Sequence, residues 1–289
     1  MAVFQPAILQ DLPAHATYLM LNLRADADTA TVRSALSGVA ALIDGERVLA
    51  GIGAGLAAFL QARIPGLRDF SGIEGSKVGL HPSAAALWLW LRESDRGELL
   101  HQQRRLMQVL SPAFEIAQQR SAFKYADGRD LSGYEDGTEN PHGDEARAVA
   151  IAGDDSSYVA VQLWEHQFDK LQTIPETEQD QMIGRRKSDN EELSDAPESA
   201  HVKRTAQEDF DPEAFVMRRS MPWTDGARGG LNFVAFATSY DAFEAQLRRM
   251  SGAEDGIIDA LFRFTLPQST CYFWCPPLKD GQVDLQALF

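Results

Sequence analysis

The sequence predicts an α+β protein, and a weak internal repeat is either a coincidence or the sign of two similar units, each a sheet covered by helices on one face. An apolar strand followed by an amphipathic helix spans His15–Ile43, and the same order returns in weaker form in Leu231–Met250. In both places the helix begins at an aspartate, a residue favoured at helix N-termini. The length of 289 residues is enough for one large domain or two of ordinary size.

The composition is that of a globular protein, and it argues against two classes of partner. Hydrophobic residues make up 44% of the chain and charged residues 24%, as in soluble domains. The net charge of −15 argues against nucleic acid and anionic membranes as partners. We expect no membrane helix, which needs roughly 20 apolar residues, and no signal peptide, because the amino terminus lacks a basic region and apolar core. We therefore expect a cytoplasmic protein.

The first half of the chain alternates strand and helix patterns. His15–Leu23 and Arg47–Ile52 are typical of strands, and the short aromatic-rich run Ala84–Leu91 predicts a buried strand. Apolar residues recur at helical spacing in Thr31–Ile43 and Glu98–Leu110. The predicted order is therefore strand, helix, strand, strand, helix.

A glycine-rich stretch, Gly51-Ile52-Gly53-Ala54-Gly55, superficially resembles a loop that cradles phosphate. A dinucleotide site also needs a clear strand–helix–strand unit and an acidic residue for the ribose, and neither is evident around this stretch. We expect close backbone packing at these glycines instead.

The second half contains a long polar segment between apolar patterns. Ser157–Leu163 predicts a strand, and Glu165–Leu171 the beginning of a helix. Thr173–Glu198 lacks a periodic apolar face, so it is either disordered or an ordered functional loop, and the motifs that follow it favour order. The remaining expected elements are a strand at Leu231–Ala237, a helix from Asp241 to Met250 that stops at Gly252, a short helix at Ile257–Phe262 and a strand at Cys271–Trp274.

The two cysteines, Cys271 and Cys275, stand four residues apart in a predicted strand. Their side chains share one face, but the rise of a strand places the Cα atoms too far apart for a disulfide. Two thiols alone also make a poor metal site. We expect buried free thiols, in agreement with a reducing compartment.

One loop near the middle of the chain, Gly133–Pro141, has the sequence GYEDGTENP. Its glycines allow backbone conformations that other residues avoid and let the chain approach a ligand closely. Asp136 stands between them, so a tight loop would position its carboxylate. On this motif alone, an ordinary turn with acidic residues is the simpler interpretation.

Among the six histidines, His201 has the most informative neighbours. The other five have no companion at the spacing of metal ligands, so a zinc site with two histidines is not expected. His201 ends the polar segment, and Arg204 follows three residues later. This arrangement suits one imidazole as the axial ligand of a haem iron, with a nearby cation for an anionic propionate. Arg186 and Lys187 compete with Arg204 for that second role.

Several segments together resemble the dye-decolorizing peroxidase family, most of all its compact bacterial cytoplasmic class. The resemblance covers nearly the whole chain, and the motifs occur in a family-like order and spacing. The segments are GYEDGTENP, IGRRKSDNEEL, SAHVKRT, VMRRSMPW and GGLNFVAFATSYDAFEAQLRRM.

The resemblance implies two ferredoxin-like halves, with antiparallel sheets covered by helices and haem b held mainly by the C-terminal half. It divides one compact unit into an N-terminal half, residues 1–135, and a haem-binding half, residues 136–289. It also implies an activity: reduction of hydrogen peroxide and oxidation of dyes, phenolics or similar one-electron donors through a ferryl intermediate. A homo-oligomer is expected as well.

The resemblance further implies residues at the cofactor. His201 is expected as the proximal iron ligand, and Asp259 as the acidic partner that gives its imidazole anionic character. Arg204 is expected as a partner of a haem propionate, and Gly137 as part of the loop at the cofactor.

On the distal side, Asp136 is expected to transfer the proton of the peroxide, and Arg218 to hold the peroxide and stabilise the developing negative charge. Ser220 falls where the family places a third polar residue, often Asn in other members. Because Arg218 and Arg219 are adjacent, the choice between them depends on a one-residue alignment.

Two alternatives differ in what they require. A haem-binding or haem-handling protein with little turnover would also use His201, but it would not need Asp136 and Arg218. An acidic interaction module without a cofactor would leave the coincidence of motifs unexplained. The chain ends soon after the last predicted strand, so we expect no shell-targeting tail.

Overall fold

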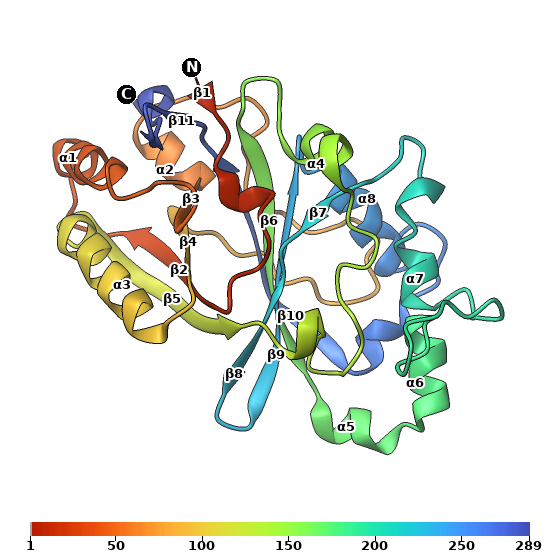
Figure 1. Cartoon of the computed structure of the whole chain (residues 1–289). Helices are drawn as coiled ribbons and strands as arrows, with labels where there is room; N and C mark the ends of the chain where they lie inside the picture. Colours follow the sequence, from red (N-terminus) through yellow and green to blue (C-terminus); the bar gives the residue numbers. More distant parts are fainter. Residues whose placement is uncertain (1) are drawn as a thin grey trace.

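The computed structural model describes residues 2–289 and has an α+β architecture (Figure 1). In the N-terminal half the strands pair antiparallel in the order β3-β4-β2-β5. This pairing of a strand–helix–strand–strand–helix–strand chain is the ferredoxin-like arrangement. Its elements are β2 (His15–Leu23), α1 (Thr29–Ala40), β3 (Val48–Ile52), β4 (Leu87–Glu93), α3 (Arg96–Leu110) and β5 (Phe114–Phe123), with the short α2 (Ala54–Phe59) after β3.

The C-terminal half repeats this topology with the order β10-β6-β9-β8. Its second strand is interrupted, and both pieces, β7 and β8, pair with β9. The first connection also carries several helices in place of one. The elements are β6 (Ser157–His166), α5 (Phe168–Thr173), α6 (Glu176–Ile183), α7 (His201–Arg204), β7 (Met217–Arg218), β8 (Met221–Asp225), β9 (Arg228–Ala237), α8 (Asp241–Met250) and β10 (Thr265–Cys275).

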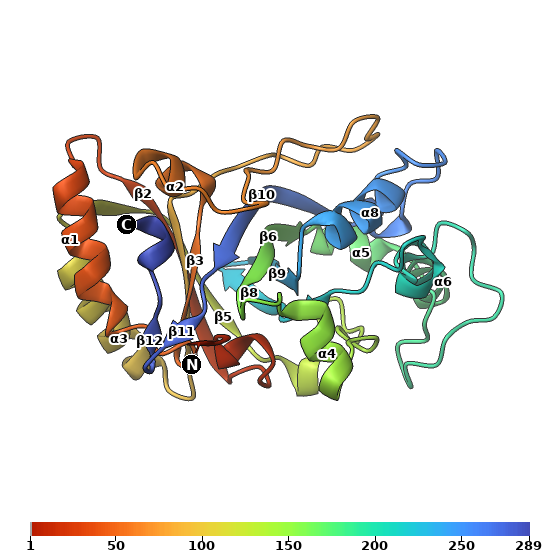
Figure 2. The same ribbon diagram turned by 90° about the horizontal axis from the view of Figure 1, so that it is seen from above.

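The two half-sheets join at both sides, so that the strands form a closed ring. Trp274 of β10 pairs with Ile52 of β3, and Ala122 of β5 pairs with Trp223 of β8. Viewed from above, α1 and α3 lie beyond one half-sheet and α8 and α6 beyond the other (Figure 2). The molecule therefore has a layer of helices, two facing half-sheets and a second layer of helices.

Large aromatic side chains fill the space between the half-sheets. Trp88 is fully buried, with its ring 5.9 Å from that of Phe273 and 6.3 Å from that of Phe236. Trp90 and Tyr18 belong to the same buried cluster. This core joins residues of both halves, because β4 contributes the tryptophans and β9 and β10 contribute the phenylalanines.

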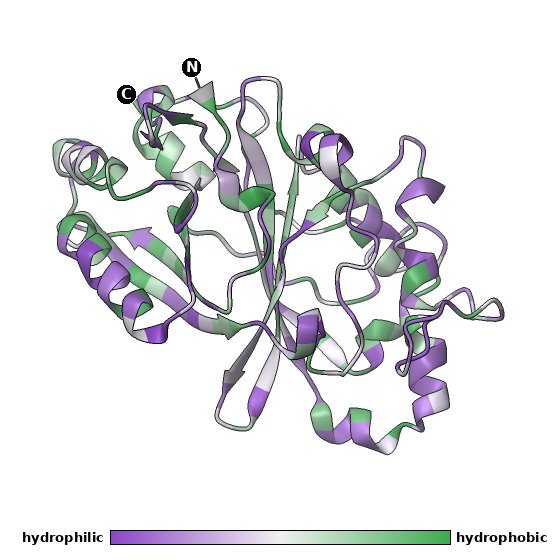
Figure 3. Cartoon of the chain, viewed as in Figure 1, coloured by the Kyte–Doolittle hydropathy of each residue, from purple (hydrophilic) through white to green (hydrophobic). Residues whose placement is uncertain are grey.

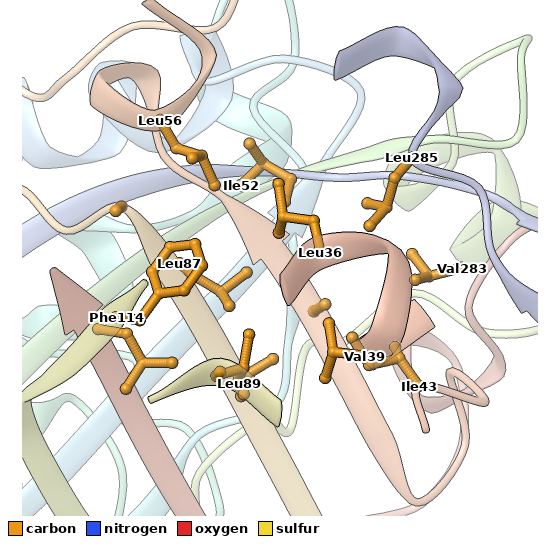
Figure 4. Packing of buried hydrophobic residues seen from close by; sticks show 14 of the residues in the cluster. Leu36, Val39, Ile43, Ile52, Leu56, Leu87, Leu89, Phe114, Val283 and Leu285 are labelled. Atoms are coloured by element: carbon orange, nitrogen blue, oxygen red, sulfur yellow. The ribbon is translucent and has the colours of Figure 1, made fainter. Parts of the chain in front are cut away.

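A second core lies under the helices of the N-terminal half (Figure 4). Leu36 and Val39 of α1 pack here with Leu89 of β4 and with Phe114 of β5. The helical spacing predicted for Glu98–Leu110 is visible in α3, which has a hydrophilic side and a hydrophobic side (Figure 3).

The ends of the chain meet at this half. β1 (Ala2–Val3) pairs with β11 (Leu278–Lys279), and β11 pairs with β12 (Gln282–Val283). Leu285 and Leu288 then pack into the core under α1. The predicted division after residue 135 falls in the connection between β5 and β6; it stays a prediction.

Several predicted elements need correction. β6 continues to His166, so the helix expected from Glu165 begins only at Phe168. The polar segment Thr173–Glu198 contains α6 and an ordered loop. In the topological repeat, Leu231–Met250 corresponds to β4 and α3 rather than to the unit that begins at His15.

Two other expectations are confirmed by packing. A side chain at Gly53 would place its Cβ 1.9 Å from the carbonyl oxygen of Ala85, so this glycine permits a close backbone approach. Cys271 and Cys275 are buried free thiols. Among the described residues, no helix has the length and apolar character needed to cross a bilayer.

Candidate active site

A cavity lies in the C-terminal half. Residues of β6, β9, α7 and α8 and of the central loop line it. Three of the predicted site residues, His201, Asp136 and Arg218, line the same cavity. Its apolar wall consists of Ile183, Leu231, Phe233, Phe243, Leu247, Met250, Leu261 and Phe264.

His201 is the first residue of α7, and its imidazole forms a hydrogen bond with a buried carboxylate. Its Nδ1 lies 2.7 Å from Oδ2 of Asp259, whose side chain is fully buried. The other oxygen of Asp259 accepts a hydrogen bond of 2.8 Å from the backbone N–H of Leu261. An ionised carboxylate makes Nδ1–H the donor, which leaves Nε2 free to bind a metal on the cavity side.

Asp136 lies in a loop whose shape depends on glycine. Gly133 and Gly137 have φ angles of +95° and +75°, in the left-handed region that favours glycine. Burial raises the pKa of the Asp136 carboxyl above its ordinary value. The positive charge of Arg218 opposes this rise, and the negative charge of Asp130 adds to it. Asp136 is therefore a carboxylate that is protonated more readily than one on the surface.

Strand alternation separates the two adjacent arginines. Arg218 lines the cavity, and its Nε is buried without a hydrogen-bond partner. Arg219 points away from it and donates to the carbonyl oxygens of Ile8 and Leu9, at 3.1 and 2.6 Å. Burial lowers the pKa of Arg219 to about 10. Only Arg218 has a guanidinium available to a ligand in the cavity.

Ser220 and Gly137 lie beside the main cavity rather than in its wall. Both line a second cavity of about 460 Å³, which shares Asp136 and Arg218 with the first. The hydroxyl oxygen of Ser220 lies 3.4 Å from the backbone nitrogen of Val234 and accepts its hydrogen bond. Ser220 is therefore close to the predicted distal pair but is not in the wall that His201 lines.

The structure places Arg204 outside the cavity wall. Its guanidinium forms a two-pronged pair with Asp255, with both N–O distances 2.8 Å, and also donates to the carbonyl oxygen of Arg249 at 2.7 Å. Arg204 is buried and does not line the cavity. Arg204 is the last residue of α7, and its pairing with Asp255 holds the guanidinium outside the cavity that His201 lines. The geometry does not favour a propionate contact, and we do not propose one.

Sequence reasoning missed a second buried histidine–carboxylate pair in the cavity wall. His166 Nε2 lies 2.8 Å from Oδ2 of Asp130, and its Nδ1 lies 2.7 Å from the hydroxyl of Thr265. Burial alone would raise the pKa of Asp130, but the hydrogen bond and charge of His166 outweigh it and lower that pKa. Strand alternation could have indicated His166 but not its partner, since Gln162, Trp164 and His166 stand at every second position of β6, and all three line the cavity.

The residues present fit a haem group. The described part of the chain contains no group of three or more His, Cys, Asp or Glu side chains that could hold a metal ion. His201 presents a single imidazole to a largely apolar cavity, which suits an iron whose other ligands come from a porphyrin. The apolar wall suits the macrocycle, and the unpaired Nε of Arg218 offers a donor to a polar ligand.

Comparison with known proteins decides the family. Residues 127–280, more than half of the chain, match the family model described as Dyp-type peroxidase, C-terminal. The chain belongs to the Dyp-type peroxidase family. Dyp-type peroxidases are haem enzymes that reduce peroxide with electrons from a second substrate, which confirms the predicted activity and cofactor.

Relatives of this Dyp-type peroxidase cover almost its whole length. The dye-decolorizing peroxidase of Mycobacterium tuberculosis is 28% identical over 96% of this chain and 89% of that protein. A dye-decolorizing protein from V. cholerae has 27% identity and a TM-score of 0.82, covering 93% of this chain and 96% of that one. A DypB variant of Rhodococcus jostii RHA1 in complex with heme has 26% identity and a TM-score of 0.81, covering 93% and 95%. The predicted fold of two ferredoxin-like halves is thereby confirmed.

Proposed function

We propose that this peroxidase reduces hydrogen peroxide at a haem b held by His201, and that dyes, phenolics or similar one-electron donors supply the electrons. The observation that carries the proposal is one cavity lined by His201, Asp136 and Arg218. When bound, the haem supplies the iron that binds peroxide and the electrons that break its O–O bond.

His201 would bind the iron through Nε2, while Asp259 accepts the hydrogen bond of Nδ1–H. This partner fixes the tautomer and the orientation of the ring, and it makes the imidazole a stronger electron donor. Gly137 would keep the loop close to the cofactor, because a side chain at its φ of +75° would be strained.

Asp136 would move the proton. As a carboxylate it takes the proton of the peroxide oxygen that faces the cofactor, and as a carboxylic acid it gives the same proton to the outer oxygen, which leaves as water. Because burial raises its pKa, the Asp136 carboxylate is a stronger base than that of an ordinary aspartate.

Arg218 would stabilise the charge that develops as the O–O bond breaks. Arginine side chains do not exchange protons in catalysis of this kind, so the role of Arg218 is electrostatic. Removal of one preorganised donor of this kind typically costs about 3 kcal/mol, or on the order of 10²-fold in rate. Ser220 would act beside it as a third polar group of the second cavity.

A haem carrier with little turnover has no use for Asp136 and Arg218, so no observation favours that alternative. We further propose that the enzyme works in the cytoplasm as a homo-oligomer, with residues 1–135 and 136–289 as its two halves. The two buried free thiols agree with a reducing compartment.

The test is steady-state oxidation of an anthraquinone dye by haem-loaded Asp136→Asn and Arg218→Leu, with Glu145→Gln on the exposed surface as a control. We expect each site variant to bind haem normally and to lose on the order of 10²-fold in kcat/KM for hydrogen peroxide. Wild-type kcat/KM in both variants would contradict the proposed roles.

A further inference from the structure

The side chain of Asn140 joins the central loop to β7, because its amide bonds the backbone of Arg218 as a neighbouring strand would. Oδ1 of Asn140 accepts a hydrogen bond of 2.8 Å from the backbone N–H of Arg218. Nδ2 of the same amide donates to the carbonyl oxygen of Arg218, at 3.1 Å. One side chain thus satisfies both backbone groups of Arg218, four residues after the loop has presented Asp136.

A second amide makes a matching connection two residues upstream. The buried side chain of Gln207 accepts a hydrogen bond of 3.0 Å from the backbone N–H of Val216 through Oε1. Its Nε2 donates to the carbonyl oxygen of Glu139, in the loop, at 2.8 Å. The two amides therefore connect consecutive loop residues to alternate strand residues.

This pattern follows from the edge position of β7. On one edge β7 pairs with β9, and the backbone N–H of Arg219 donates to Val234 there. Residues 216 and 218 present their backbone groups to the opposite edge, because alternate residues of a strand point the same way. No strand of the described chain covers that edge. The amides of Asn140 and Gln207 take the place of the missing strand.

We propose that Asn140, supported by Gln207, is a positioning residue that fixes Arg218 relative to Asp136. This inference rests on the proposed roles of that pair. The loop contributes a second constraint, since the backbone N–H of Asn140 donates to Gly137 at 3.1 Å and closes a turn directly after Asp136. Asp136 and Arg218 lie in segments about 80 residues apart in the sequence. The side-chain amide of Asn140 joins these two segments through its two hydrogen bonds.

An amide is the group that this position requires. Arg218 offers one donor and one acceptor, and only an amide presents one acceptor and one donor at the same spacing. A carboxylate of the same shape would keep the bond from the N–H of Arg218 but would turn a second oxygen toward its carbonyl oxygen. The loss of one hydrogen bond between neutral groups has only a modest effect on stability. A displacement of about 1 Å, by contrast, can cost on the order of 10²-fold in rate.

The first test is Asn140→Asp in the haem-loaded enzyme, with the exposed Asn22→Asp as a control for the same chemical change elsewhere. We expect kcat/KM for hydrogen peroxide to fall roughly 10- to 100-fold at neutral pH. The fall should shrink as the pH is lowered, because the introduced carboxyl, once protonated, donates to the carbonyl oxygen of Arg218 again. A wild-type rate, or a loss that does not depend on pH, would overturn the proposal.

A readout without turnover is the affinity of the ferric protein for cyanide. With haem bound through His201, cyanide would bind in the cavity that Asp136 and Arg218 line, so a displaced Arg218 should weaken cyanide binding by about 10-fold in Asn140→Asp. The absorption spectrum before cyanide is added should match that of the wild type, since His201 is untouched. An unchanged cyanide affinity would count against positioning.

A double-mutant cycle separates positioning from a general loss of structure. In an Arg218→Leu background there is no guanidinium to position, so Asn140→Asp should have little further effect on kcat/KM. Multiplicative effects of the two substitutions on kcat/KM would overturn the proposal.

The single variants show which proposal fails. If Arg218→Leu alone leaves the rate unchanged, the proposed role of Arg218 fails. If Arg218→Leu slows the enzyme but Asn140→Asp does not, only the positioning role of Asn140 fails. If Asn140→Asp is too unstable to isolate, Gln207→Glu provides the same comparison.

Discussion

The environment of each ionisable group in the cavity is set by a small number of neighbours. Burial raises the pKa of Asp136, and the charge of Arg218 is the largest influence that opposes the rise. Asp136 accepts a proton only while it is ionised, so the rate of the peroxide step should fall as the pH drops through its pKa in the folded protein. Arg218 therefore widens the pH range of the reaction toward acid.

Removal of that charge should move the acid limit. In Arg218→Leu the pKa of Asp136 rises further, because the opposing charge is gone while burial remains. We expect the acid limb of the peroxide rate constant, measured by stopped flow between pH 3 and 8, to shift to higher pH than in the wild type, in addition to the lower plateau. An acid limb at the same or a lower pH would contradict this account of Asp136.

The family resemblance predicted several site residues that lie close together in the folded chain. His201, Asp136 and Arg218 line one cavity, and Asp259 lies against His201. Spacing alone was a poor guide to Arg204, which lies three residues from His201 but faces Asp255. His166 was missed for the opposite reason, since its partner Asp130 is 36 residues away in the sequence and only the fold joins them.

At the scale of the elements, patterns with one buried face were predicted well. β2 has the predicted bounds, and α1, α3 and β9 differ from the predicted ranges by a few residues. β5 was not predicted, because half of its ten residues are polar, only Phe114 and Ala122 are buried, and its outer edge is unpaired over most of its length. Long-range pairing with β2, which the local sequence does not encode, makes this segment a strand.

The contact between α6 and α7 fixes the position of His201 and gives a prediction at this scale. Gly184 ends α6 with a φ of +91°, and a Cβ there would lie 2.2 Å from Cγ2 of Val202 in α7. Gly184→Ala should therefore displace α7, with a cost on the order of 1–3 kcal/mol for the backbone strain alone.

We expect Gly184→Ala to lower haem affinity, measured by titration of the apoprotein, and to lower the melting temperature. Gly153→Ala is the matched control, because no atom lies within 4 Å of the Cβ it would add. Equal haem affinity in the two variants would show that α7 does not depend on this contact.

At the scale of the whole molecule, the ring of strands makes the two halves one cooperative unit. The aromatic core around Trp88 contains side chains from both half-sheets, and the C-terminal residues pack under α1. Neither half buries these surfaces alone. The sequence contained the two-unit pattern, but it could not show that the sheets close on each other, since each junction is a single residue pair.

Trp88→Ala should therefore destabilise the whole protein. Truncation of a fully buried tryptophan typically costs about 3–5 kcal/mol. We expect urea unfolding curves from tryptophan fluorescence and from haem absorbance to shift to lower denaturant together, as one transition. Leu100→Ala, on the exposed side of α3, should leave both curves in place. Two separate transitions would contradict a single cooperative unit.

The central claim is that His201 holds the haem while Asp136 and Arg218 act on peroxide in the same cavity. The most direct measurement is the visible absorption spectrum of the haem-loaded protein before and within milliseconds after one equivalent of hydrogen peroxide, for the wild type, His201→Ala and Asp136→Asn. The account predicts a rapid spectral change in the wild type, a displaced or absent Soret band in His201→Ala, and an intact band that changes slowly in Asp136→Asn. A His201→Ala spectrum identical to that of the wild type, or a wild-type spectrum indifferent to peroxide, would contradict it.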